Sequence, residues 1–369
     1  MKYFIYLVLI IYNISITSKV LLAQEFVNNN IIDYFKKQNL ALNDISYYMS
    51  SYWISTFNGL IKFDGISYKY YDLNEKSEGD IERYAIRQDT PKLEFKDLYL
   101  LESNNDELWI IPTFVNRDPN HLYLFKLKNN ILNNYKMFVS GNSRDYEIEK
   151  ILFDEKKSPL LLIRKPDENG KPDFQSHEIY ELKDGIFLKK YIDLSQNEKL
   201  LSFFSLKGME YQVIEEKINS GFILKIRKED DANEDFILDT CKDNHGMIKS
   251  YVFQDSILLI TFISDKKNIF FLKKSNHDFR FYSSNIDTFY LNYFEGLFLG
   301  DKYYGLYDTG LFEYNFFNNT YKTYDIKNCK SCTAFSISSR IKKINDEIWC
   351  IFFNVLTNSN NNNTFLFKE

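Results

Sequence analysis

The sequence predicts an all-β protein folded as a single β-propeller, with seven four-stranded blades as the expected count. Three observations lead to this prediction. The stretch from Trp53 to Tyr71 predicts three antiparallel strands in succession, its pattern returns later in the chain, and the copies are spaced as propeller blades are. Aromatic residues make up 17% of the chain, and such a composition favours strands over helices.

The first observation is the order of apolar runs and turn signals between Trp53 and Tyr71. An aromatic and β-branched run ends at Asn58-Gly59, a dipeptide that tolerates the positive φ values of a two-residue type I′ turn. A second run ends at Asp64-Gly65, a turn signal of the same kind. We therefore expect a third strand that carries three side chains on one face, those of Ile66, Tyr68 and Tyr70.

The second observation is that this pattern repeats. An anchor aromatic residue is followed at fixed offsets by Gly-Leu and then by a second aromatic residue. Two segments match it without a gap, the first with Trp53, Gly59, Leu60 and Phe63, and the second with Tyr304, Gly310, Leu311 and Tyr314. Looser copies begin at Trp109 and Trp349. Because repeated aromatic residues usually fill the space between blades, we expect these residues to be structural rather than sugar-stacking platforms.

The third observation is the spacing of the repeats. Second-strand anchors assigned by pattern lie at Trp53, Trp109, Leu161, Tyr211, Leu259, Tyr304 and Trp349. Their mean interval of about 49 residues suits a blade of four strands with loops. The last unit has a third strand at Thr364–Lys368, and residues 25–35 are expected to supply its outer strand and so close the ring. The alternative is that the chain is the front of a longer protein.

These repeats resemble the two-component regulator propeller repeat, a family pattern of a Trp-Ile-Gly-Thr strand followed by Gly-Leu-x-x-Phe-Asp. The matching residues are Trp53, Ile54, Thr56, Gly59, Leu60, Phe63, Asp64 and Tyr71. Ser55 stands where the family has Gly, and Tyr304 replaces Trp in the later copy. The resemblance implies a ligand-binding sensor module, as in the input domains of hybrid two-component sensors. The kinase His box, the DNA-binding helix-turn-helix and the membrane helix that accompany such domains are missing from this sequence.

Residues 1–23 have the pattern of a secretory signal peptide. Lys2 precedes the apolar run Phe4–Tyr12, and Ala23 stands at the expected cleavage position. The alternative is an uncleaved anchor, but the run is about half of the roughly 20 residues needed to span a bilayer, and Lys19 interrupts its extension. We therefore expect residues 24–369 to form a periplasmic or secreted propeller domain without a transmembrane segment.

The sequence predicts no cofactor, no metal site and no nucleic-acid partner. The formal net charge of -5 implies no strong field, and no basic stripe with interleaved aromatics occurs. The four histidines lie in apparent loops and share no metal spacing; they are His121, His177, His245 and His277. The acidic run 229–235 departs from the spacing of an EF-hand loop and predicts a solvated hairpin tip.

Cys329 and Cys332 form the one Cys-x-x-Cys spacing in the sequence. A four-cysteine zinc site would need a second close pair, whereas Cys241 and Cys350 stand far apart. In an oxidising compartment a disulfide is expected, either between Cys329 and Cys332 or between one of them and one of the other two cysteines.

The predicted function is non-catalytic binding of an extracellular ligand, such as a glycan fragment, or of a protein partner, such as a membrane sensor. The binding surface is expected where loops surround the central opening, with Tyr84, Phe114 and Phe174 as candidate contacts. Two alternatives stay open: a propeller-type polysaccharide lyase or glycosidase, and a structural surface protein. Binding is favoured over catalysis because the four histidines are unpaired in the sequence and the repeats carry no concentrated acid cluster.

Overall fold

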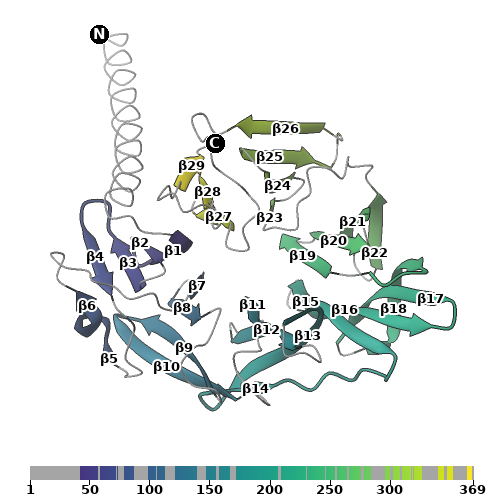
Figure 1. Ribbon diagram of the computed structural model, residues 1–369, viewed down its shortest axis with the longest axis horizontal. Helices are drawn as coiled ribbons and strands as arrows, with labels where there is room; N and C mark the ends of the chain where they lie inside the picture. Colours follow the sequence, from purple (N-terminus) through teal and green to yellow (C-terminus); the bar gives the residue numbers. More distant parts are fainter. Residues whose placement is uncertain are drawn as a thin grey trace, which may run out of the picture.

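The strands of the protein are arranged in blades around a ring, with the first strand of each blade nearest the centre (Figure 1). The computed structural model describes residues 42–367 apart from segments between strands, the longest of which are 87–98, 284–295, 326–339 and 352–363. Neighbouring strands within each blade are antiparallel. The prediction of an all-β propeller is therefore confirmed.

Blades 1 to 3 occupy the first half of the ring. Blade 1 contains β1 (Leu42–Tyr48), β2 (Ser51–Thr56), β3 (Gly59–Phe63) and β4 (Tyr68–Tyr71). Blade 2 contains β7 (Tyr99–Asn104), β8 (Glu107–Pro112), β9 (His121–Lys128) and β10 (Ile131–Phe138). Blade 3 contains β11 (Glu147–Phe153), β12 (Pro159–Pro166), β13 (Pro172–Lys183) and β14 (Ile186–Lys189). Between blades 1 and 2 lie β5 (Gly79–Asp80), the 3₁₀ turn η1 (Ile81–Tyr84) and β6 (Ala85–Ile86).

Blades 4 to 7 complete the ring. Blade 4 contains β15 (Glu198–Leu206), β16 (Met209–Ile218), β17 (Gly221–Lys228) and β18 (Asp231–Cys241). Blade 5 contains β19 (Met247–Phe253), β20 (Ser256–Ile263), β21 (Lys266–Ser275) and β22 (Asp278–Ser283). Blade 6 contains β23 (Gly296–Leu299), β24 (Lys302–Tyr307), β25 (Gly310–Asn315) and β26 (Thr320–Asp325). Blade 7 contains three described strands, β27 (Arg340–Ile344), β28 (Glu347–Ile351) and β29 (Thr364–Phe367).

The described strands thus form seven blades, and each predicted anchor lies in the second strand of its blade. The six anchors whose side-chain burial is described are all buried: Trp53, Trp109, Leu161, Tyr211, Leu259 and Tyr304. The repeat residues Leu60, Phe63 and Tyr314 are buried as well. Gly310, Leu311 and Trp349 lie in β25 and β28, where the side chains are outside the described residues. The signal peptide at 1–23 and the closing strand at 25–35 also lie outside them.

The register of blade 1 matches the expected meander, with Tyr52 opposite Phe63 and Leu60 opposite Tyr71. Gly59 opens β3 at a φ of +138°, and a Cβ there would lie 2.4 Å from the Tyr71 carbonyl oxygen. Only glycine fits this position, because both the φ value and the close strand contact exclude a side chain. Asn58 lies outside the described residues.

The second turn differs from the prediction. The connection between β3 and β4 spans four residues rather than two, and the carboxylate of Asp64 closes it by accepting hydrogen bonds from the backbone N–H groups of Ile66 (2.9 Å) and Ser67 (2.7 Å). This local hydrogen bonding makes a wider turn stable. Ile66 therefore precedes the strand and is 93% exposed, so it does not share the buried face of Tyr70.

Apolar side chains fill the space between neighbouring blades. One core joins blades 1 and 2 through Trp53, Leu60 and Leu108, and another joins blades 2 and 3 through Trp109 and Leu161. Blades 2 and 3 are also joined at their outer edges, where β10 and β14 pair in parallel. At the other end of the chain β27 contacts β1, so the described strands close the ring.

Candidate binding site in the central opening

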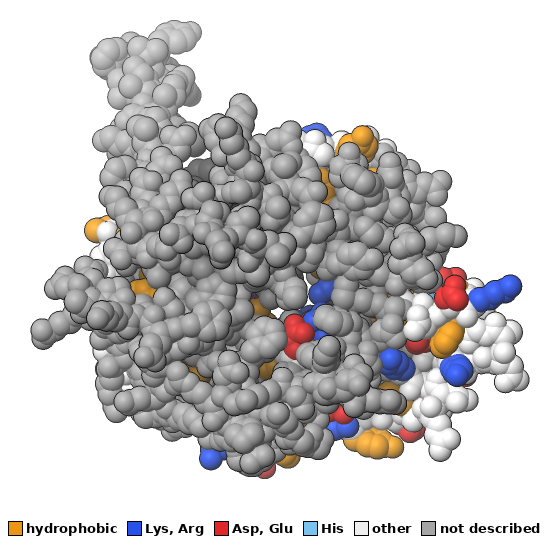
Figure 2. Space-filling model, in the orientation of Figure 1, with side chains coloured by type: hydrophobic (Ala, Val, Ile, Leu, Met, Phe, Trp, Pro, Cys, Tyr) orange, Lys and Arg blue, Asp and Glu red, His pale blue; other side chains and the backbone are white. Residues whose placement is uncertain are grey.

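Acidic and basic side chains lie together near the middle of the face seen in Figure 2. The first strands of the blades lie nearest the centre of the ring (Figure 1). Three of these strands carry a β-bulge near their beginning, in β1, β11 and β15. A bulge re-aims the side chain that follows it. The residues after the bulges are Asp44, Lys150 and Ser202, and each makes a hydrogen bond to another blade.

Asp44 joins three blades. Its Oδ2 atom accepts hydrogen bonds from the Leu101 backbone N–H in blade 2 (2.7 Å) and from the Lys342 ammonium in blade 7 (2.9 Å). The same ammonium donates to the Leu101 carbonyl and to Glu102 Oε2. Burial lowers the pKa of Lys342, but the carboxylates of Asp44 and Glu102 outweigh this effect and raise it. We call this group the closure cluster, because it joins the last blade to the first two.

A second charged group surrounds Glu149 on β11. Its carboxylate contacts Arg164 Nε at 3.2 Å, His177 Nε2 at 2.8 Å and Lys249 Nζ at 3.6 Å, and Lys249 lies on the first strand of blade 5. Burial disfavours the charged form of Glu149, yet Lys249, His177 and Arg164 hold its pKa well below the usual range. This carboxylate is therefore an ionised structural group rather than a proton donor near neutral pH.

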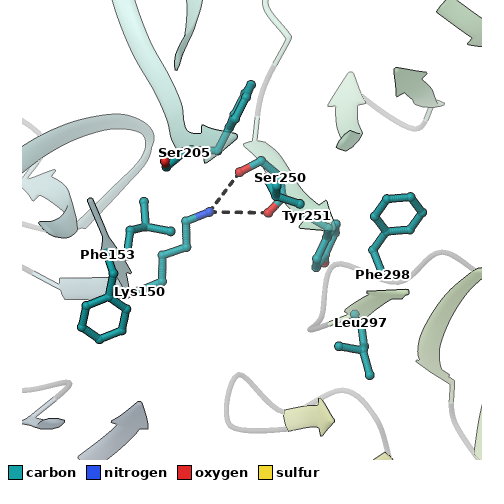
Figure 3. A pocket seen from close by; sticks show the side chains of 11 residues that line it. Lys150, Phe153, Ser205, Ser250, Tyr251, Leu297 and Phe298 are labelled. Carbon is teal, nitrogen blue, oxygen red and sulfur yellow. Dashed lines mark hydrogen bonds between the residues drawn. The ribbon is translucent and has the colours of Figure 1, made fainter. Parts of the chain in front are cut away.

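Beside these groups lies a cavity of about 300 Å³ between β11, β15, β19 and β23, the first strands of blades 3 to 6. Its wall is largely aromatic and aliphatic (Figure 3). The lining side chains that Figure 3 labels are Lys150, Phe153, Ser205, Ser250, Tyr251, Leu297 and Phe298. A concave apolar site with a few convergent polar groups is the usual form of a small-molecule site.

Lys150 provides the charge of this cavity. Its Nζ atom crosses from blade 3 to blade 5 and donates to Ser250 Oγ at 2.9 Å and to the Ser250 carbonyl at 3.5 Å (Figure 3). Ser250 Oγ in turn lies 2.8 Å from Ser202 Oγ in blade 4. The ammonium thus lies at the cavity wall and brings a positive charge beside aromatic side chains.

The residues predicted from sequence as ligand contacts stay predictions, because none of their side chains is described. Phe114 lies outside the described residues, and Tyr84 lies in η1, where its side chain is not described. Phe174 lies in strand β13 rather than in a loop. Lys150 and Ser250 were missed because their blades lack the repeat pattern, and because the bulge that aims Lys150 has no local sequence signal.

The histidines were expected in loops, and the structure differs for two of them. His121 and His177 lie in strands β9 and β13 rather than in loops, while His277 is outside the described residues. Cys329 and Cys332 lie outside them as well, so their disulfide stays a prediction. Cys241 is a free thiol in the described structure. No helix in the described part of the chain is long and apolar enough to cross a membrane.

The acidic run 229–235 is not simply a solvated hairpin tip. Its last residue, Asp235, lies inside β18 and pairs with Arg227 Nε at 2.8 Å and Lys225 Nζ at 2.8 Å on β17. Arg227 and Lys225 also contact Glu198 on β15. The run is therefore partly used for pairing, because opposite charges face each other across strands.

Glu229, at the start of this run, has a raised pKa that makes the stability of the protein depend on pH. It shares the ammonium of Lys190 with Glu210, and burial followed by the hydrogen bond to Glu210 raises the pKa of Glu229 to about 7. A glutamate in the unfolded chain titrates near pH 4.3, so the stability that the bound proton contributes is complete below about pH 4.3 and is lost as pH rises to about 7.

We expect the melting temperature of Glu229→Gln to fall less than that of the wild type when the pH is raised from about 5 to about 8. The amide keeps the shape of the protonated acid but does not titrate. Thermal melts over a pH series measure the difference. Glu216→Gln, at a partly exposed glutamate on β16 of the same blade, is the control. Parallel curves for wild type and Glu229→Gln would show that Glu229 titrates as an ordinary glutamate.

Comparisons with known proteins assign the chain to no family. No protein-family model matches the chain, and no curated protein matches it. One similar solved structure is YCF48 bound to D1 peptide, with 10% identity over 72% of this chain and 74% of that chain and a TM-score of 0.41. Another is the Dos1 propeller, with 7% identity over 85% and 79% and a TM-score of 0.45. A third is an ulvan lyase of polysaccharide lyase family PL25, with 6% identity over 84% and 88% and a TM-score of 0.45. All three TM-scores are below 0.5, so the β-propeller architecture rests on the strands and blades of this chain itself.

Proposed function

We propose that this protein is a non-catalytic binding module whose central cavity takes an acidic glycan fragment. The observation that carries the proposal is the cavity of about 300 Å³ in which Lys150 and Ser250 face aromatic side chains of four blades. Its volume is at the lower end of the range of about 300 to 1,000 Å³ found for small-molecule sites. A short fragment therefore fits better than a long polymer.

The chemistry of the wall supports a sugar acid. Aromatic rings that are only partly buried, such as those of Tyr251 and Phe153, offer faces that pack against the C–H groups of a sugar, and the Ser205 and Ser250 hydroxyls both donate and accept hydrogen bonds. The Lys150 ammonium is a donor-only group with a positive charge, so it discriminates for a carboxylate or sulfate against a neutral sugar.

Binding without turnover is supported by the residue types at the cavity. Elimination or hydrolysis of a glycan needs a general base or a pair of carboxyl groups at the reacting bond. Among the described residues that line the cavity, none is Asp, Glu or His. The carboxylates on neighbouring strands are engaged in ion pairs, such as Glu149 with Arg164. The glycosidase alternative thus lacks a carboxyl pair among the described lining residues. Lys150 and Tyr251 are residue types that also serve as bases in elimination, so product analysis decides between binding and a lyase activity.

The resemblance of blades 1 and 6 to two-component regulator repeats supports a sensory setting for this binding. In the proposal the protein acts after export, in the periplasm or outside the cell. It binds a membrane sensor, and this contact reports whether the cavity holds a ligand. The signal-like pattern of residues 1–23 supports export. The amino-terminal sequence of the protein recovered from the periplasm or medium tests this part, since a chain that still begins at Met1 contradicts cleavage.

The binding proposal is tested by a thermal-shift screen of residues 24–369 against oligogalacturonides, sulfated oligosaccharides and neutral xylo-oligosaccharides. A ligand that binds only the folded state raises the melting temperature by mass action. We expect shifts with acidic fragments alone, and unchanged oligosaccharide by mass spectrometry. Cleaved products would favour the enzyme alternative. Cooperative melting without any shift would favour a protein partner or a structural role.

Replacing Lys150 with Met is expected to weaken binding of an acidic fragment at least tenfold, because a charge-assisted hydrogen bond contributes roughly 1.5 to 3 kcal/mol. Methionine keeps much of the apolar stem, so the wall stays filled. Lys136→Met, on the outer strand of blade 2, is the matched control. Equal affinities of wild type and Lys150→Met would place the acid-binding group elsewhere.

A further inference from the structure

A second cluster of functional side chains lies at the outer end of blade 4, away from the central cavity. Asp239 and Cys241 end β18, and His245 follows in the connection to β19. One ligating atom from each of the three lies within 4.8 Å of the others. His245 Nε2 is 3.3 Å from Cys241 Sγ and 3.7 Å from Asp239 Oδ2.

The histidine is oriented as metal-binding histidines are. Its ring is fully buried, and its Nδ1 atom lies 3.0 Å from Oε2 of Glu215, a buried carboxylate on β16. The same oxygen accepts the His245 backbone N–H at 2.5 Å, which fixes the residue from two sides. With the Nδ1 proton donated to Glu215, the Nε2 lone pair faces Cys241 and Asp239. A carboxylate that holds the far nitrogen of a histidine is the usual outer partner at zinc sites.

We propose that Asp239, Cys241 and His245 bind a zinc ion, with Glu215 as the positioning residue for His245. A tetrahedral zinc ion with bonds of about 2.0 to 2.3 Å separates nitrogen, sulfur and oxygen ligands by roughly 3.4 to 3.6 Å, close to the distances found. Three protein ligands leave one position for water or for a group of a partner molecule. This proposal replaces the sequence-based expectation of no metal site.

The surrounding charge favours a cation. The carboxylates of Glu215 and Asp239 lie 3.0 and 3.7 Å from the two ring nitrogens of His245 and make the cluster negative. The thiol donates its hydrogen bond to the Asp243 carbonyl at 2.7 Å. A divalent ion neutralises this negative potential, and the thiol releases its proton to solvent when its sulfur binds the ion.

The cluster of Asp239, Cys241 and His245 is open to solvent on one side and supported by a neighbouring strand on the other. Residues Lys242, Asp243 and Asn244 are exposed, so solvent reaches the cluster from one side. On the inner side β17 packs closely against the end of β18: a Cβ at Gly221, which has a φ of +148°, would lie 2.1 Å from the Cys241 carbonyl oxygen. This close approach fixes the backbone that carries the sulfur ligand.

Titration of the metal-free protein with Co²⁺ and Zn²⁺ tests the proposal. Cobalt bound to a thiolate gives a charge-transfer band in the near ultraviolet, so we expect this band at one equivalent of Co²⁺ and its loss when Zn²⁺ is added. The variant Cys241→Ser is expected to lose the band and to weaken Zn²⁺ binding at least 100-fold. Glu215→Gln is expected to weaken Zn²⁺ binding about 10- to 100-fold while keeping the band.

Asp243→Asn is the control, because it removes a nearby negative charge without removing a proposed ligand side chain. Circular dichroism melts of each variant without metal check that the fold is kept. If the wild type gives no thiolate band with Co²⁺, or if Cys241→Ser binds Zn²⁺ as tightly as the wild type, the proposed site is wrong. In the second case the metal is held by other cysteines of the chain.

Discussion

Replacing Lys342 with Met is expected to lower the free energy of unfolding by about 3 kcal/mol. The substitution leaves the Asp44 carboxylate, which is 1% exposed, without the ammonium at 2.9 Å. Breaking a buried ion pair by removing one partner costs about 3 to 5 kcal/mol, and the lower value applies because the Lys342 side chain is 23% exposed. The closure cluster joins blade 7 to blades 1 and 2, so the loss weakens ring closure.

Chemical denaturation of the wild type, Lys342→Met and Lys343→Met measures this effect. Lys343 is the neighbouring lysine on β27 and is exposed, so its substitution is expected to change stability by less than about 0.5 kcal/mol. The double variant Asp44→Asn/Lys342→Met is expected to recover part of the loss, because no buried charge is then left alone. Equal effects at Lys342 and Lys343 would contradict a role in closure.

The same cluster predicts an alkaline limit of stability. The pKa of Lys342 is raised in the folded protein, and lysine in the unfolded chain titrates near 10.4. Its contribution is therefore complete below about pH 10.4 and is lost as the pH rises through the folded value.

Replacing Trp109 with Ala is expected to lower the free energy of unfolding by about 3 to 5 kcal/mol. Trp109 is fully buried, and its ring lies 5.3 Å from that of Tyr135 and 6.0 Å from that of Phe187 in the next blade. The Lys126 ammonium lies 5.6 Å from its centroid. The indole thus fills the space between blades 2 and 3, and alanine leaves a cavity there.

Trp109→Phe is the milder comparison. Among the described residues no partner for the buried Trp109 indole N–H is found, so phenylalanine loses volume without losing a hydrogen bond. Denaturation of both variants, together with the affinity of the remaining folded protein for an acidic oligosaccharide, separates two roles. A structural anchor changes stability alone. A loss of affinity with unchanged stability would show that the tryptophan is a ligand platform.

The sequence predicts the parts of this fold that depend on local sterics and repetition. Gly59 is needed because of its φ value and its contact with Tyr71, and Trp53 and Trp109 recur because every pair of blades leaves a similar space. The turn at Asp64 was predicted wrongly, because a carboxylate that accepts two backbone hydrogen bonds stabilises a longer turn than Asp-Gly alone suggests.

The residues of the central cavity and of the proposed zinc site could not be predicted from the sequence. The contacts that orient them join residues far apart in the chain and form only when the chain folds. Lys150 meets Ser250 only because a bulge in β11 aims it across the ring. His245 is oriented by Glu215, which lies in a different strand of blade 4 and belongs to no spacing motif. The first pair forms only when blades 3 and 5 lie in the same ring, and the second only when blade 4 folds, so neither pair has a local sequence signal.

Calorimetric titration of residues 24–369 with an acidic oligosaccharide selected by the thermal-shift screen measures whether the central cavity binds an acid. Wild type, Lys150→Met and the control Lys136→Met are compared at low and high salt. We expect one site per chain, an affinity that falls as salt rises, and a loss of at least tenfold in Lys150→Met alone. Binding that is unchanged in Lys150→Met and insensitive to salt would contradict an acid-binding site in the central cavity.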